Sequence, residues 1–128
     1  MPVSILQPSP RPTGNFPLFT ALVDTGATVT CISEKVVSIV GLRPQGRVTV
    51  TGVAGPSSHN SYVFMLGFST QNPAITSAHT VDVLHLLTER ILGAQIETND
   101  HYDVLLGMDV ISTGQLIVCK TGTFSFAF

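Results

Sequence analysis

Short apolar runs separated by Gly and Pro dominate the chain, a pattern typical of a fold built mainly from strands. Residues 16–23 form one such run and end at Asp24, as a buried strand would. Val and Thr alternate over residues 47–53, and an apolar stretch returns over residues 62–68. The Gly-rich segment 52–58 between them predicts a hairpin with a mobile turn.

The rest of the chain predicts further strands and one or two short helices. Residues 33–41 begin with an N-cap residue and end with Gly, and residues 108–113 are closed by Gly114, so both segments favour helix. Residues 89–96 fit a helical turn or a loop, and residues 9–14 fit a loop. Further strands are expected at residues 3–6, 28–32, 74–87, 102–107, 116–119 and 124–128. The fold class is therefore mainly β.

The length of 128 residues predicts a single domain over residues 1–128. Hydrophobic residues make up 44% of the chain, enough for a core without disulfides. Charged residues make up only 11%, against roughly a quarter in an average globular protein. The surface is therefore built largely from uncharged polar residues, or part of it is covered by a partner.

Charge and hydropathy exclude two classes of partner. The net charge is -2 and the six Lys and Arg residues are not clustered, so we expect no nucleic-acid ligand. The apolar runs are shorter than a membrane span, and the N-terminus lacks the pattern of a secretory signal. We therefore expect no membrane insertion, and a cytoplasmic location is favoured for this segment.

The Cys and His residues give no metal-binding pattern. Cys31 and Cys119 lack the spacing of a zinc site and are expected to be small core residues, with a disulfide between them left open. The four histidines have no tight ligand spacing: His59, His79, His85 and His101. No metal and no other cofactor is expected.

Asp24 is the strongest candidate for chemistry. It opens an Asp-Thr-Gly triplet directly after an apolar strand, which places a carboxylate at the edge of a core, where neighbours can change its proton affinity. An ordinary turn is the alternative, because all three residue types favour turns. The context favours chemistry: Ala27 follows, a Gly-rich hairpin comes next, and residues 104–107 form an apolar run that ends in Gly.

With these elements in this order, the chain resembles a retropepsin-type aspartic protease. The matching segments are residues 22–27, 51–55 and 104–107. The resemblance implies the closed β-barrel of the acid protease fold and an aspartic-type endopeptidase acting on polypeptides. Because the triplet occurs once, it also implies a homodimer with one Asp24 from each subunit, the two carboxylates activating a water molecule by general acid and base catalysis.

The resemblance assigns roles to the neighbours of Asp24. The Thr25 hydroxyl is expected to bond across the dimer axis, and Gly26 lets the backbone approach the carboxylate. Substrate binding is expected at Ala27 and Val29 and at the tip of a mobile flap, formed by Gly52, Val53, Ala54 and Gly55. An ordinary surface hairpin is the alternative for the flap.

The chain also departs from the family pattern. Viral members commonly carry acids just after the triplet and an Arg after the downstream Gly, whereas Thr28, Val29 and Met108 stand here. This favours a cellular or bacterial branch. Asp109 is expected to meet backbone N–H groups at the start of the short helix. Asp103 lacks the following Thr-Gly, so we reject it as a second catalytic acid.

Two questions remain open from the sequence. By resemblance, the termini of two subunits interleave, and residues 3–6 and 124–128 have the alternation of such interface strands, although they could instead pad the core of their own subunit. The rival function is a catalytically weak or inactive module of the same fold that dimerises or binds peptides.

Overall fold

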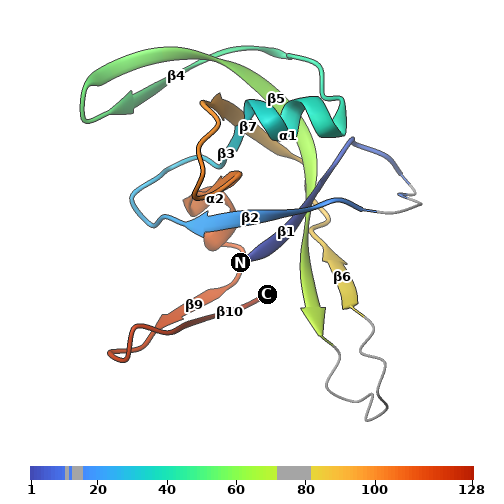
Figure 1. Ribbon diagram of the computed structural model, residues 1–128, viewed down its shortest axis with the longest axis vertical. Coiled ribbons are helices and arrows are strands. Elements are labelled where there is room, and N and C mark those ends of the chain that lie inside the picture. Colours follow the sequence, from blue (N-terminus) through green and yellow to red (C-terminus); the bar gives the residue numbers. More distant parts are fainter. Residues whose placement is uncertain (11, 13–15, 72–81) are drawn as a thin grey trace.

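Strands form the framework of the molecule in the computed structural model, which describes residues 1–10, 12, 16–71 and 82–128 (Figure 1). The strands are β1 (Pro2–Leu6), β2 (Leu18–Val23), β3 (Cys31–Ser33), β4 (Gly46–Gly52), β5 (Gly55–Gln71), β6 (Asp82–Leu86), β7 (Ile91–Ile96), β8 (Val104–Leu106), β9 (Gln115–Val118) and β10 (Phe124–Ala127). The helices are α1 (Glu34–Val40) and α2 (Met108–Ile111). The mainly β class with two short helices is confirmed.

Six strands close into a barrel in the order β1, β2, β8, β3, β7, β5, with β5 pairing back to β1. The β2–β8 and β3–β7 pairs are parallel, and the other pairs in the ring are antiparallel. Closure matters because it removes the free sheet edges that would otherwise need a cover. The expected closed barrel is therefore present.

The core fills the inside of this barrel. In β2 the buried residues Phe19 and Ala21 alternate with exposed Leu18, Thr20 and Leu22, as the period of a strand requires. The largest fully buried side chains come from β5, β1, β3, β8 and the two helices; they include Phe64, Phe68, Ile5, Ile32, Leu66, Leu106, Val36 and Val110. Burial of these side chains is the main stabilising contribution to the barrel.

Helix α1 begins and ends where the sequence predicts. The Ser33 hydroxyl accepts a hydrogen bond from the Val36 N–H at 3.4 Å, and Gly41 adopts the left-handed conformation with φ 75°. Glycine is suited to this conformation because it has no Cβ, so the N-cap and the terminal Gly define the helix locally. No helix in the described ranges combines the length and hydropathy of a membrane span.

Strands β9 and β10 form a separate two-stranded hairpin, at the lower left of Figure 1. Phe126 packs against Phe68 of the barrel, with ring centroids 5.3 Å apart. Ile117, Val118 and Phe124 of the same hairpin remain exposed, with Val118 at 72%. The two strands at residues 116–119 and 124–128 are thus confirmed, and the hairpin presents apolar side chains to its surroundings.

Some sequence predictions are wrong. Residues 89–96 are largely strand β7, because pairing with β5 on one side and β3 on the other stabilises an extended backbone that local sequence does not indicate. Residues 28–30 precede β3 instead of belonging to it. The expected turn at residues 52–58 shrinks to Val53 and Ala54, because Ser57 and Ser58 pair with β4.

For the N-terminal strand, the structure agrees with the second of the two alternatives left open, the core of its own subunit. Residues 3–6 belong to β1, which pairs with β2 and with β5 inside one subunit and is buried. Both of its edges are therefore already paired inside the subunit. Cys119 is exposed instead of lying in the core, while Cys31 is buried, and both thiols are free. Parts of the expected loop 9–14 and of the expected strand 74–87 lie outside the described residues.

Candidate active site

Asp24 lies at the end of β2, where the strand leaves the barrel. Its N–H donates to the Leu106 carbonyl of β8 at 3.0 Å, so the parallel β2–β8 pairing continues up to the acid. The Gly26 N–H donates to Asp24 Oδ1 at 2.9 Å, and the Ala27 N–H donates to the Asp24 carbonyl at 3.1 Å. The carboxylate is half-buried and is held in one orientation by its own loop.

Gly107 packs closely against the backbone of this loop. A Cβ at this position would lie 2.5 Å from the Val29 carbonyl carbon and 2.6 Å from the Val29 oxygen, both backbone atoms. Only glycine therefore allows β8 and the Asp24 loop to pack this closely. This is the reason in physical terms for the apolar-apolar-Gly element that the sequence indicated.

The loop also completes the start of α2. The first N–H groups of a helix have no partner inside it. Here the Met108 N–H donates to the Ala27 carbonyl at 2.8 Å, and the Asp109 N–H donates to the Thr28 carbonyl at 3.2 Å. Helix and loop thus satisfy each other's backbone groups, so neither can move alone without losing hydrogen bonds.

Thr30 and Asp109 form the strongest connection between loop and helix. The Thr30 hydroxyl donates to Asp109 Oδ1 at 2.7 Å and accepts from the Gly107 N–H at 3.1 Å. The Thr30 N–H donates to Asp109 Oδ2 at 3.0 Å, and the Val110 N–H donates to Oδ1 at 2.9 Å. The predicted contact of Asp109 with the helix start is confirmed through Val110. The role of fully buried Thr30 was missed, because nothing in the sequence distinguishes it from exposed Thr28.

The flap candidate is the hairpin of β4 and β5. The two strands pair from Gly46 with Ser61 to Gly52 with Gly55, leaving Val53 and Ala54 as a two-residue turn. Gly55 has φ 102°, which favours glycine, and a Cβ at Gly52 or Gly55 would meet nothing within 4 Å. In Figure 1 this tip and the loop after β2 extend toward the same side of the molecule.

The arrangement of these elements agrees with a family comparison. Residues 14–113 match the family described as "gag-polyprotein putative aspartyl protease". The chain belongs to this family. It is thereby retropepsin-like, as its motifs suggested, while the cellular or bacterial branch stays a prediction. No curated protein matches the chain.

Two further acids, Asp109 beside the Asp24 loop and Asp103 before β8, already have hydrogen-bond partners. The Asp109 carboxylate is occupied by Thr30 and Val110 as described. Asp103 accepts from Lys35 Nζ at 2.9 Å and from the Thr20 N–H at 3.1 Å. Burial by itself raises the pKa of Asp103, but the Lys35 ammonium and the Thr20 N–H outweigh it and hold the pKa below its usual value. Neither acid is free to pair with Asp24.

Cys31 is the first residue of β3, directly after the Asp24 loop, and it is buried. Burial raises the pKa of its thiol most, and the nearby Asp109 carboxylate raises it further. A hydrogen bond with the Ala94 backbone lowers the pKa by less, and the Asp24 carboxylate adds the smallest increase. The thiol therefore stays protonated at neutral pH and does not compete as a nucleophile.

The surface around Asp24 includes apolar and small side chains. Leu22 is 46% exposed, because the alternation of β2 turns it away from the core two residues before the acid. Thr25 and Gly26 are exposed as well, and Ala27 and Val29 are half-buried. Val29 also lines a cavity of about 560 Å³.

Proposed function

We propose that this chain, as a single domain over residues 1–128, is an aspartic endopeptidase that acts as a homodimer. The proposal rests chiefly on the Asp24 loop, in which a half-buried carboxylate accepts the Gly26 N–H while Gly107 and the Thr30–Asp109 pair fix the backbone. Such rigid support of a catalytic acid is what precise positioning of a reacting group requires.

In the proposed mechanism two Asp24 carboxylates, one from each subunit, lie close together and share one proton. The ionised carboxylate acts as general base on a water molecule between them, and the protonated one donates to the scissile carbonyl. The exposed Thr25 side chain is accessible for the expected hydrogen bond across the dimer axis. No cofactor takes part in these steps.

Substrate is proposed to bind as an extended strand between the flap and the Asp24 loop. The tip residues Gly52, Val53, Ala54 and Gly55 would close over it and exclude water. Val53 is fully exposed in the single subunit and so presents an apolar side chain to a ligand. Ala27 and Val29 would form the floor on the other side.

The dimer is proposed for two reasons. The Asp-Thr-Gly triplet occurs once in the chain, and Asp103 and Asp109 are bound elsewhere, so we expect the second catalytic acid to come from another copy of the chain. In addition, an isolated two-stranded hairpin is only marginally stable in water. Pairing of the β9–β10 hairpin with that of a second copy would cover Ile117, Val118 and Phe124, so the interface is expected there and not at β1.

Substitution of Asp24 by Asn tests the proposal. Asp24→Asn should abolish cleavage of an unfolded protein substrate while sedimentation still shows a dimer. Asp100→Asn, which changes an exposed acid outside the Asp24 loop, is the matched control and should cleave like wild type. If the dimeric wild-type protein cleaves nothing between acid and neutral pH, the chain is instead the inactive dimerisation or peptide-binding module.

Dilution tests the shared site separately. Because a single subunit supplies one Asp24, specific activity should fall below the dimer dissociation constant. Activity per subunit that stays constant in demonstrably monomeric solutions would contradict the shared site but not peptidase activity itself.

A further inference from the structure

A cavity of about 560 Å³ opens beside the Asp24 loop and shares only Val29 with the proposed substrate-binding residues. It lies between α2, the chain from His85 to Leu92, and the C-terminal residue Phe128. Its volume falls in the range of roughly 300–1,000 Å³ that is typical of ligand pockets. The space is thus large enough for an aromatic side chain.

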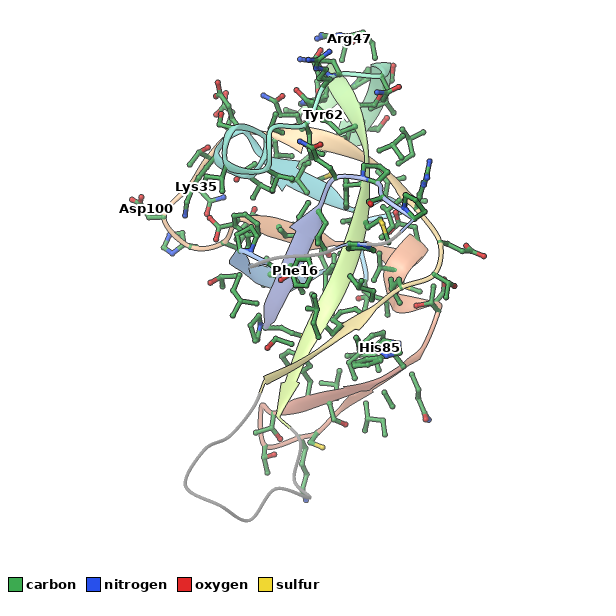
Figure 2. All side chains as sticks on the ribbon, turned by 90° about the vertical axis from the view of Figure 1, so that its right-hand side faces the viewer. Phe16, Lys35, Arg47, Tyr62, His85 and Asp100 are labelled. Atoms are coloured by element: carbon green, nitrogen blue, oxygen red, sulfur yellow. The ribbon has the colours of Figure 1, made fainter. Side chains whose placement is uncertain are left out.

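The walls of the cavity are mainly apolar. Val29 contributes from the Asp24 loop, Val110 from α2 and Leu92 from β7. The Phe128 ring stacks on Phe68 at 4.7 Å and lies 4.6 Å from the imidazole of His85, which Figure 2 shows beside the C-terminal hairpin. Leu92 is 58% exposed, so a large leucine side chain on this wall lacks full cover within the subunit.

Charged groups also line the cavity but do not favour a charged ligand. Glu89 and Arg90 carry opposite charges side by side along the chain, and the Asp109 carboxylate is already occupied by Thr30 and Val110. The charges of Glu89 and Arg90 offset each other. Binding here is therefore expected to depend on apolar contact.

We propose that this cavity is a distal subsite that accepts a large apolar or aromatic side chain of the polypeptide substrate, away from the bond that is cut. This inference rests on the proposed peptidase function. The occupant is assigned because Val29 belongs both to the loop that carries Asp24 and to the cavity wall, so the cavity adjoins the floor of the proposed cleft. A strand lying over the loop places alternate side chains on the side of the floor.

Peptide cleavage provides the test. A set of peptides with one constant sequence at the scissile bond would carry either Phe or Ser at a single outer position, moved one residue at a time away from that bond. At one outer position, wild type should cleave the Phe peptide with about tenfold higher kcat/KM than the Ser peptide, a ratio that corresponds to about 1.4 kcal/mol.

Two matched variants connect this preference to the cavity. Leu92→Ser removes an apolar wall at an exposed position, and Ile39→Ser removes a similarly exposed side chain (55%) from α1, which contributes no residue to the cavity. Leu92→Ser should lower kcat/KM for the Phe peptide to about the value for the Ser peptide, so that the preference for Phe is lost. Ile39→Ser should keep the preference.

The possible failures are distinguishable. If wild type cleaves peptides without preference at every outer position, the distal subsite is wrong and the peptidase function stands. An equal loss of kcat/KM for both peptides in Leu92→Ser would show that Leu92 has a structural role. A weaker dimer in this variant with an unchanged preference for Phe would show that Leu92 contacts a second subunit. Either result overturns the inference. If no peptide is cleaved at all, the peptidase function itself fails.

Discussion

Replacing Thr30 by Val tests the connection on which the Asp24 loop depends. The two side chains have nearly the same shape, because the substitution replaces the hydroxyl with a methyl group of similar size. That hydroxyl donates to Asp109 Oδ1 at 2.7 Å and accepts from the Gly107 N–H at 3.1 Å, and Thr30 is fully buried. Asp109 keeps the bonds from the N–H groups of Thr30 and Val110, but the Gly107 N–H loses its acceptor.

The size of the effect follows from these two losses. A hydrogen bond to a charged group contributes about 1.5–3 kcal/mol, and a buried N–H without a partner costs about 1–3 kcal/mol. Burial of the added methyl group returns about 0.8 kcal/mol. We therefore expect Thr30→Val to lower the free energy of unfolding by about 2–5 kcal/mol, a large fraction of the total for a domain of this size.

Urea denaturation at one fixed subunit concentration measures this change, since the proposed dimer would make the stability depend on concentration. Thr30→Ser keeps the hydroxyl, loses one methyl group and should cost only about 1 kcal/mol. Thr28→Val alters an exposed threonine in the same loop and should stay within about 0.5 kcal/mol of wild type. Equal urea midpoints for Thr30→Val and Thr30→Ser would refute the role of the hydroxyl.

Three further substitutions or labelling experiments test other parts of the structure. Gly107→Ala should lower the free energy of unfolding by about 1–3 kcal/mol in urea, because its Cβ would meet the Val29 backbone at 2.5 Å; a midpoint equal to wild type would contradict this packing. Ser4→Ala should raise stability by about 1 kcal/mol in thermal melting, since the buried Ser4 hydroxyl has no hydrogen-bond partner in the part of the chain that the structure describes; a lower melting temperature would show a missed partner. Iodoacetamide should label exposed Cys119 quickly and buried Cys31 only on unfolding; labelling of Cys31 as fast as Cys119 would contradict its burial. Because burial raises the Cys31 pKa above 9.0, the folded state should lose stability as pH rises through that higher value.

The sequence predicts those features whose cause is local. The boundaries of α1 follow from the Ser33 cap and from Gly41. The β4–β5 hairpin follows from the Val and Thr alternation before Gly52, the Gly-rich segment and the apolar stretch that returns after it. The Asp24 loop was recognisable because a triplet and a distant apolar-Gly element occur in a fixed order. The structure shows why the distant element ends in glycine, because Gly107 packs closely against the backbone of the Asp24 loop.

Features that depend on partners far along the chain were not predictable in this way. Strand β7 contains Gly93 and Ala94, which weaken any local strand signal, yet a Cβ at Gly93 would lie 2.7 Å from the Phe64 ring. Small residues are needed there because of packing, not local propensity. Likewise, the burial of β1 follows from its pairing on both sides, which no property of residues 3–6 alone reveals.

The Thr30–Asp109 pair also indicates how a dimeric site would assemble. The subunit by itself supplies hydrogen bonds that fix the Asp24 loop, with Leu106, Gly107 and α2 as partners. The loop can therefore reach its conformation before a second subunit binds, so dimerisation would bring together two half-sites that are already ordered. Binding of preformed surfaces loses less conformational entropy than binding coupled to loop ordering. The Thr30→Val variant should for this reason dimerise more weakly than wild type as well as unfold more easily.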